Sequence, residues 1–383
     1  MSTTFLLDGH SCALLESGAQ FFPALCADLA AAQHSIYLET YIFAADATGQ
    51  RVATALKAAA ARGVAVHLLL DGYGSADLPA PFIEQLRQAG VDVQWFRRER
   101  GWFHLRRYRL RRLHRKLAVM DGRIAYVGGI NIVDDIPPGL PLTAPRLDYA
   151  VRIEGALAAQ VLHEMRRLWT ALKWISLKKR LVRWRREWRG QSPASAHLEL
   201  LWRDNLRHRR DIERAYLLAI HQAQREIVLA HAYFLPGRRL RRALIEAAQR
   251  GVRVVLLVQG RVEYLIQHYA TQALYDQLLA AGIEIYEYRA SFLHAKVGVV
   301  DEQWATVGSF NFDPFSLWLA REANVAVHHA GFADALRGSL MRAIATGAER
   351  VHGGSLTRWQ RLWARASYGL IRLAVAWLFG RRR

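Results

Sequence analysis

Two segments of this chain carry the same polar side chains at the same spacing. The first is Leu-His-Arg-Lys-Leu-Ala-Val-Met-Asp at residues 113–121, and the second is Leu-His-Ala-Lys-Val-Gly-Val-Val-Asp at residues 293–301. Glycine and asparagine follow at matching distances, as Gly128, Gly129 and Asn131 and as Gly308, Ser309 and Asn311. One copy alone could be a structural hairpin with polar surface residues. Two copies favour a paired chemical site.

The residues around each histidine indicate internal β-strands. Side chains two apart on a strand project to the same face, so His114 and Lys116 share one face, and His294 and Lys296 share another. The neighbouring residues are apolar, and a buried imidazole and ammonium need polar partners. An anionic ligand would supply one, so the spacing favours an anion-binding site.

The elements that would position these residues are also repeated. The segment around Gly63, residues 59–72, recurs around Gly251 as residues 247–260, and each predicts a helix, a glycine stop and a buried strand. Two further pairs repeat in the same order, namely residues 86–96 with 279–288 and residues 36–43 with 227–234. Helices that alternate with strands in both halves predict an α/β fold with two mixed or largely parallel sheets.

The chain is therefore expected to be a fused pseudo-dimer. Residues 190–196 are small, polar and contain proline, which is typical of a linker. We expect a first lobe at residues 1–189, a second lobe at residues 190–350, and a C-terminal amphipathic helix at residues 351–383.

The doubled pattern H-x-K-x4-D followed by G-G/S-x-N resembles the signature of the phospholipase D superfamily, and the likeness covers nearly the whole chain. Two accessory strings are similar to those of bacterial cardiolipin synthases, above all the subtype without N-terminal transmembrane helices. They are Asp71-Gly-Tyr-Gly-Ser75, and Leu201-Trp-Arg-Asp-Asn205 followed by Asp211-Ile-Glu213. The resemblance implies two lobes related by a pseudo-twofold axis, each a mixed sheet flanked by helices, with one active site between them.

The resemblance also implies a reaction in two displacements at phosphorus, through a phosphohistidine. One histidine attacks phosphorus, while the other protonates the leaving alkoxide and then acts as base for the incoming alcohol. By likeness to family members, His114 would be the nucleophile and His294 the general acid and base, although the near symmetry leaves the order open. The groups implied to hold the phosphate oxygens are Lys116, Lys296, Asn131, Ser309 and Asn311. No metal ion and no cofactor is implied.

Carboxylates complete the implied site. Asp148 and Glu322 match the family position of the acids that orient the two imidazoles. An insertion at residues 134–141 precedes Asp148 and is expected to form a loop at the mouth of the site. Asp121 and Asp301 end the two motifs and are counted with the catalytic set, although at seven residues from the histidines they are expected to brace backbone turns.

Charge and hydropathy restrict the partner. Lys and Arg total 53 against 33 Asp and Glu, and the net charge of +20 suits either nucleic acid or an anionic bilayer. The two cysteines, Cys12 and Cys26, fit a reducing compartment. The N-terminus does not read as a signal peptide, and no apolar run reaches the roughly 18 residues that span a bilayer. We therefore expect a cytoplasmic protein that binds a membrane from one face.

Basic segments with interleaved aromatic and apolar residues favour lipid over nucleic acid. Residues 97–116 and 166–189 each hold ten basic residues and one acid. Helical spacing places Leu177, Leu181, Trp184 and Trp188 on one side of the second segment. The C-terminal segment has Trp359, Leu362, Trp363, Ala366, Leu370, Leu373 and Trp377 on one side, and Arg358, Arg361, Arg365 and Arg372 on another. One such helix would usually pack on the core, but two favour a membrane interface. Nucleic acid is therefore disfavoured.

Together with the resemblance, these features imply a phosphatidyltransferase bound peripherally to the cytoplasmic face of the cell membrane. Its substrate would be the anionic phospholipid phosphatidylglycerol, with a second phosphatidylglycerol as acceptor, so that cardiolipin forms and glycerol leaves. A phospholipase D-type hydrolase and a metal-independent nuclease are the alternatives. Glu39 and His231 are further candidates for pocket residues.

Overall fold

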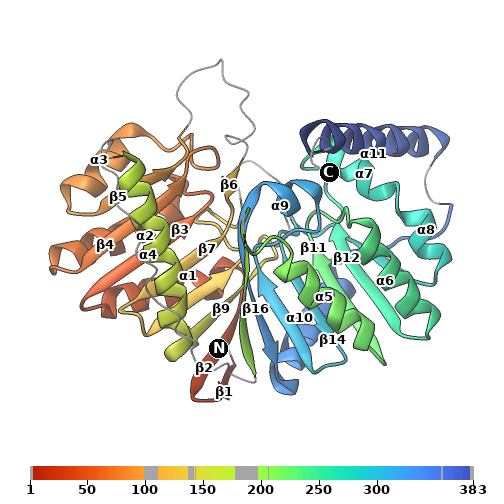
Figure 1. The fold of residues 1–383 in the computed structure, drawn as a ribbon, viewed down its shortest axis with the longest axis horizontal. Coiled ribbons are helices and arrows are strands. Elements are labelled where there is room, and N and C mark those ends of the chain that lie inside the picture. The colour runs from red at the N-terminus through yellow and green to blue at the C-terminus, as the bar shows by residue number, and fades with distance from the viewer. Residues whose placement is uncertain are drawn as a thin grey trace.

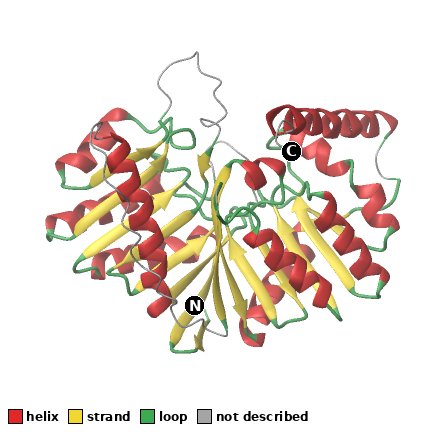
Figure 2. Ribbon diagram, viewed as in Figure 1, coloured by secondary structure: helices red, strands yellow, loops and turns green. Residues whose placement is uncertain are grey.

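The chain forms two mixed β-sheets that lie side by side, with helices covering them (Figure 1 and Figure 2). The computed structural model describes residues 3–379 apart from 99–110, 137–141, 143, 177–196, 206 and 355–356. The expected α/β architecture of two helix-flanked mixed sheets is confirmed. The expected linker at residues 190–196 and the apolar positions 177–188 lie outside the described residues.

The first sheet has eight strands in the order β1-β2-β9-β8-β7-β3-β4-β5. Strands β3, β4 and β5 are parallel to one another, and the remaining neighbours are antiparallel. The strands are β1 (Thr4–Leu7), β2 (His10–Glu16), β3 (Ser35–Thr40), β4 (Ala65–Asp71), β5 (Asp92–Phe96), β7 (Lys116–Met120), β8 (Ile124–Gly128) and β9 (Tyr149–Glu154). Helices α1 (Ser17–Ala31), α2 (Ala47–Ala61) and α3 (Ala80–Gln88) cover one face, and α4 (Ala156–Ser176) covers the other.

The second sheet repeats this arrangement in the order β10-β16-β15-β14-β11-β12-β13-β17, and the short β6 joins it beside β16. The strands are β6 (Arg112–Leu113), β10 (Leu198–Arg203), β11 (Glu226–His231), β12 (Arg253–Gln259), β13 (Glu284–Tyr288), β14 (Lys296–Val300), β15 (Trp304–Gly308), β16 (Ala320–His328) and β17 (Ala348–Arg350). The helices are α5 (Asp211–Gln222), α6 (Arg238–Gln249), α7 (Leu265–Gln272), α8 (Tyr275–Ala280), α9 (Pro314–Trp318), α10 (Ala330–Gly347) and α11 (Arg358–Phe379).

Strand register fixes which residues correspond between the lobes. Glu39 lies opposite Leu117 across β3 and β7, and Ala230 lies opposite Val297 across β11 and β14. The β7–β8 hairpin matches the β14–β15 hairpin in register, and β9 matches β16. Asp148, just before β9, therefore corresponds to Glu322 in β16. The repeats read from the sequence are therefore structural repeats.

The glycine stops in those repeats have a backbone reason. Gly63 follows α2 with φ of +88°, and Gly251 follows α6 with φ of +90°. Side chains other than glycine rarely adopt this left-handed conformation, so glycine ends each helix and turns the chain into the next strand. Each of these strands, β4 and β12, then runs toward the centre of the molecule and ends at a polar residue that holds the site.

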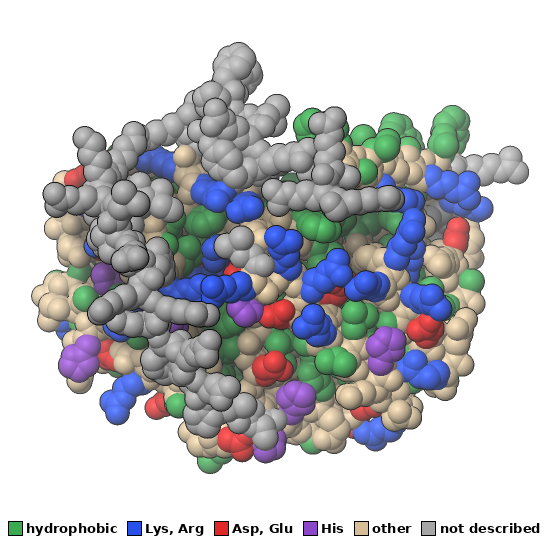
Figure 3. All heavy atoms as spheres, viewed as in Figure 1, with side chains coloured by type: hydrophobic (Ala, Val, Ile, Leu, Met, Phe, Trp, Pro, Cys, Tyr) green, Lys and Arg blue, Asp and Glu red, His purple; other side chains and the backbone are tan. Residues whose placement is uncertain are grey.

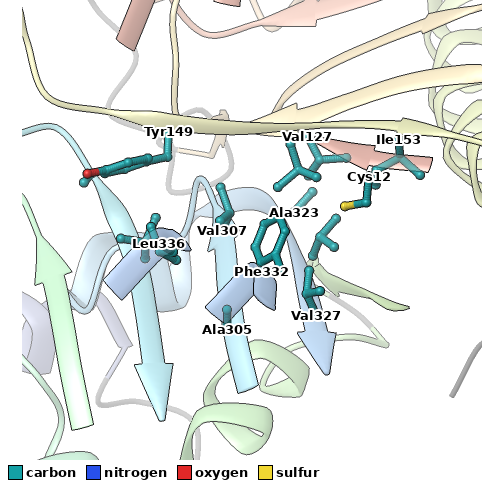
Figure 4. Close-up of a cluster of buried hydrophobic side chains, with 14 of the residues drawn as sticks. Cys12, Val127, Tyr149, Ile153, Ala305, Val307, Ala323, Val327, Phe332 and Leu336 are labelled. Atoms are coloured by element: carbon teal, nitrogen blue, oxygen red, sulfur yellow. The ribbon is translucent and has the colours of Figure 1, made fainter. Parts of the chain in front are cut away.

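A hydrophobic core joins the lobes. It combines α4 and α10 with the inner faces of both sheets, and Figure 4 shows Val127, Tyr149 and Ile153 of the first lobe beside Val307, Ala323 and Phe332 of the second. Polar contacts reinforce the junction, since the Tyr149 hydroxyl lies 2.8 Å from that of Ser339, which donates to Glu16 at 2.6 Å. Each fully buried Val or Leu contributes about 1.5–3 kcal/mol, so the lobes form one body.

Within the residues that the structure describes, no helix combines the length and apolar character needed to cross a bilayer.

Candidate active site

The two motif histidines lie where the lobes meet, just before their strands. Strands β7 and β14 begin at the lysines, so the expectation that His114 and Lys116 share one strand is wrong in detail. The cause is a set of bonds to the opposite lobe: His114 N–H donates to the Arg321 carbonyl at 3.0 Å, and His294 N–H donates to the Leu147 carbonyl at 2.8 Å. Each histidine is thereby fixed to the lobe that does not contain it.

His114 and Lys116 nevertheless project to the same side. The Tyr41 ring lies 4.9 Å from the His114 ring, centroid to centroid, and 5.2 Å from Lys116 Nζ. Lys116 Nζ also donates to the His114 carbonyl at 2.6 Å, and Lys296 Nζ lies 2.8 Å from His294 Nδ1. Each lysine therefore lies beside its histidine, but only Lys296 contacts the imidazole, whereas Lys116 contacts the backbone of His114.

Two residues absent from the predicted site hold the backbone in front of the histidines. The Asp71 carboxylate accepts from Leu113 N–H at 2.7 Å, and the Gln259 amide oxygen accepts from Leu293 N–H at 3.1 Å. Both are buried at the end of corresponding strands, β4 and β12. A signal existed, because each is the last residue before the glycine that ends the repeat at residues 59–72 and 247–260.

The orienting acids are exchanged between the lobes. Glu322 lies 3.0 Å from His114 Nδ1, and Asp148 lies 2.6 Å from His294 Nδ1. The side chains of His114 and His294 are 15% and 14% exposed, whereas those of Glu322 and Asp148 are 0% and 4% exposed. The two rings are therefore slightly exposed, whereas the acids that contact them are almost completely buried.

The supports of the two acids differ. Ser309 Oγ donates to Glu322 at 2.6 Å, whereas the Asp148 carboxylate accepts from Tyr149 N–H at 2.8 Å. Gly129 corresponds to Ser309, and a Cβ placed on it would lie 2.3 Å from Asp148 Oδ1. Glycine in the first lobe and serine in the second are thus each matched to the length of the facing acid.

Burial alters the charge of the site. It lowers the pKa of Lys116 to about 7, helped by the charge of Lys296, and lowers the pKa of Lys296 to about 8. Burial also lowers the pKa of His114, and it lowers the pKa of His294 to well below its usual value. The pKa of the buried Asp148 is raised to about 6. Lys116, Lys296 and His114 each add to the lowering for His294, so the charges of the two motifs act on a common region. A bound phosphodiester would relieve this repulsion between buried cations.

The two asparagines flank this region with different partners. Asn131 Oδ1 accepts from Ile42 N–H at 3.1 Å, which leaves its amide hydrogens to donate elsewhere. Asn311 is 3% exposed, and its Oδ1 is buried with no hydrogen-bond partner among the described residues. Buried amides of this kind can hold phosphate oxygens through their N–H groups.

Asp121 and Asp301 lie at the other end of the strands. Asp121 accepts from the backbone N–H groups of residues 33–35, and Asp301 accepts from those of residues 224–226, all at 2.7–2.9 Å. A strand of five residues separates each aspartate from the histidine of its motif, and such a strand is about 16 Å long. Both aspartates brace the turn before the neighbouring strand.

Glu39 and His231 have other neighbours. Arg115, which lies between His114 and Lys116, donates to the Glu39 carboxylate at 2.5 and 2.9 Å, and its guanidinium lies 5.5 Å from the Trp202 ring of the other lobe. His231 is 1% exposed and packs on Phe312 at 4.2 Å. Both are buried behind the reacting groups.

A metal centre is not evident in the described part of the chain, where no three His, Cys, Asp or Glu residues are grouped closely enough to hold an ion.

The chain also matches a known protein family. The family model described as "Cardiolipin synthase, PLD-like domain" matches residues 25–169 and 216–343, which hold both histidines. The chain is a member of this family within the phospholipase D superfamily.

Among individual proteins, the chain is 41% identical to cardiolipin synthase B of Escherichia coli (strain K12) over 351 residues, which is 90% of this chain and 83% of that one. It is 29% identical to cardiolipin synthase A of Pseudomonas putida over 340 residues, 86% of this chain and 67% of the relative. The fold also matches the crystal structure of phosphatidylserine synthase from Haemophilus influenzae Rd KW20, with a TM-score of 0.72, 14% identity, and coverage of 95% and 94%.

Proposed function

We propose that this protein is a cardiolipin synthase that transfers a phosphatidyl group from one phosphatidylglycerol to another. The observation that carries the proposal is the pair of half-buried histidines, each oriented by an acid of the opposite lobe and each beside a buried lysine. The similarity to cardiolipin synthase B over 90% of the chain supports the lipid substrate.

The first displacement uses His114 as nucleophile. With its Nδ1 proton directed at Glu322, the ring keeps a lone pair on Nε2. Nε2 attacks phosphorus, the bond from phosphorus to the glycerol oxygen breaks, and His294 gives a proton to the departing oxygen. The products are glycerol and a phosphatidyl group on His114.

The second displacement reverses these roles. His294 removes the proton from the hydroxyl of a second phosphatidylglycerol, whose oxygen attacks phosphorus and releases His114. The stronger lowering of the His294 pKa would suit the opposite order, because a neutral imidazole is the better nucleophile. Mapping the trapped phosphohistidine to residue 114 or 294 distinguishes the two orders.

The lysines and asparagines of the motifs would hold the phosphate during both steps. Lys116 and Lys296 would bind the non-bridging oxygens as point charges, and Asn131 and Asn311 would donate N–H groups to them. Ser309 would act through Glu322, to which its hydroxyl donates.

Helix α11 supports a membrane partner. One side faces the second lobe, where Ala364 and Ile371 are buried and the Tyr368 hydroxyl accepts from Arg241 at 3.3 Å. The helix also packs along α7. Its large apolar residues instead face outward, and we call them the α11 stripe: Trp359, Leu362, Trp363, Leu370, Leu373 and Trp377, each 54–73% exposed. Figure 3 shows hydrophobic side chains along this edge with basic ones below them. The stripe is typical of a helix that inserts into lipid.

The α11 stripe continues toward the site. Val262, Tyr264, Leu265 and Ile266 lie at the start of α7 and are each 48–63% exposed. The ring of Tyr264 lies 5.9 Å from that of Tyr233. The charge of Arg146, two residues before Asp148, lowers the pKa of Tyr264 against the effect of burial, so Tyr264 lies near the site. A bilayer that covers α11 and the first turn of α7 would bring lipid headgroups to the mouth of the active site. We propose that residues 351–383 form this membrane-interface unit, beside lobes at residues 1–189 and 190–350.

Attachment at the cytoplasmic face of the membrane is part of the proposal. Both cysteines are unpaired thiols, which fits a reducing compartment. The basic side chains of α11, among them Arg361, Arg365 and Arg372, would meet the anionic headgroups, each contributing about 1 kcal/mol.

The decisive experiment is mass spectrometry of lipids after the purified protein is incubated with phosphatidylglycerol vesicles. We expect cardiolipin and glycerol from the wild-type protein and from His221→Ala, which alters an exposed histidine, and none from His114→Ala. Phosphatidic acid as the sole product would assign hydrolysis instead. Metal-independent nicking of DNA without lipid turnover would assign a nuclease.

Membrane binding is tested by sedimentation with vesicles. We expect Trp363→Ser and Trp377→Ser together to reduce binding to anionic vesicles, whereas Leu218→Ser should leave it unchanged, because Leu218 is 56% exposed but lies on α5. Equal loss in both proteins, or in neither, would contradict a specific role of the α11 stripe.

A further inference from the structure

An arginine breaks the symmetry of the site at its rim. Where the lobes cross, Leu147 bridges to Leu293, and Arg321 pairs with Leu113 in the corresponding place. The residue before Leu147 is Arg146, and the residue before Arg321 is Ala320. The first lobe thus carries a guanidinium where the second carries a methyl group.

The backbone directs Arg146 toward the reacting groups. Asp148 lies two residues further along the same extended segment and contacts His294 at 2.6 Å. Side chains two apart in an extended chain leave it on the same side, so Arg146 projects on the side of His294. Its charge contributes to the lowered pKa values of His294 and Lys296, which agrees with this direction.

In the part of the chain that the structure describes, Arg146 forms no ion pair of its own, although its charge acts on Asp135 and Asp148, whose pKa values it lowers against the effect of burial. It is partly buried, and no carboxylate among the described residues lies within ion-pair distance of its guanidinium. Arg115 shows the contrast, since its guanidinium is buried and binds Glu39 through two hydrogen bonds. A partly buried guanidinium without an acid is stabilised by a bound anion, and its planar group suits a phosphate.

The reaction itself presents a second anion. In the proposed reaction the two lysines bind the phosphate that is transferred. The attacking hydroxyl belongs to a second lipid, which carries its own phosphate one glycerol unit away. We propose that Arg146 binds the phosphate of this acceptor lipid and thereby makes an anionic lipid alcohol the preferred second substrate over water or a neutral alcohol. The proposal rests on the proposed transferase function and adds a specificity-determining residue to it.

The test is a competition between acceptors. Vesicles of phosphatidylglycerol in a neutral carrier lipid are incubated with protein and 1-butanol, and three products are measured: cardiolipin, phosphatidylbutanol and phosphatidic acid. For Arg146→Gln we expect the ratio of cardiolipin to phosphatidylbutanol to fall about 10-fold or more, with the sum of products little changed, because one charge-assisted contact to the anionic acceptor is lost. Arg146→Lys should restore part of the ratio, because it keeps the charge.

The matched control is Arg242→Gln. Arg242 lies on the outer helix α6 with an 82% exposed side chain, so the variant removes the same charge far from the rim and should keep the wild-type ratio. A parallel fall of cardiolipin and phosphatidylbutanol in Arg146→Gln, or an unchanged ratio, would overturn the proposal. Absence of cardiolipin from the wild-type reaction would instead overturn the proposed function.

Discussion

In the second lobe, Ala230 and Ala295 take the places that Glu39 and Arg115 hold in the first. The histidine, the lysine, the exchanged acid and the polar residue that holds the preceding backbone are kept in both lobes. The lobes therefore agree in the groups that we propose to bind the phosphate and differ at Glu39 and Arg115. The first lobe thus has a buried ion pair next to its histidine in the chain, and the second has two alanines at the same places.

Removal of either histidine has the largest expected effect. His114→Ala and His294→Ala should each lower the rate of phosphatidyl transfer about 10⁴-fold or more, because a single site needs both rings. The rate is measured on vesicles, with folding checked by thermal unfolding. If one variant kept a tenth of the wild-type rate, the two lobes would have to work as separate sites.

Gly129 and Ser309 occupy corresponding places beside the two acids, but substituting them should reduce activity by very different amounts. Gly129→Ser places a Cβ 2.3 Å from Asp148 Oδ1 and must displace that acid, so we expect a loss of about 10²-fold or more in kcat. Ser309→Gly removes one hydrogen bond to Glu322 and should cost about 10-fold. Equal losses in the two variants would mean that the acids are supported alike, contrary to their observed contacts.

Loss of the Glu39 carboxylate should affect stability more than turnover. Glu39→Ala leaves Arg115 buried without its acid, and we expect the free energy of unfolding to fall by about 3–5 kcal/mol, measured by denaturant unfolding. The double variant Glu39→Ala with Arg115→Ala reproduces the pair of the second lobe and should recover most of this loss. A double variant no more stable than Glu39→Ala would show that the ion pair is needed for the fold of the first lobe.

The pH dependence of kcat/KM should be narrow. Asp148 has a pKa raised to about 6 and loses its charge below that pH, whereas Lys116 has a pKa lowered to about 7 and loses its charge above that pH. Activity should therefore be greatest between about pH 6 and 7 and fall on both sides, since kcat/KM follows the free protein. Lys116→Arg should move the alkaline limb upward, and a flat profile from pH 5 to 9 would contradict both assignments.

Much of the fold could be predicted from the sequence because the duplication is visible in it. The glycine stops at Gly63 and Gly251 and the two motifs gave the order of strands and helices in each lobe, and the structure has the same order. The exchange of acids could not be predicted, since 208 residues separate His114 from Glu322 and no local pattern links them. The role of Arg115 could not be predicted either, because its position in the motif H-x-K is variable and its ion pair depends on Glu39 from another strand.

The exchanged acids also bear on how the protein is made. Glu322 follows His114 by 208 residues, so a growing chain holds this histidine long before the acid that contacts it has been synthesised. An unfinished polypeptide beside the membrane would then leave lipids intact, and reactivity would begin only when the last strands join. Two half-chains produced separately should likewise be inert alone and regain turnover on mixing.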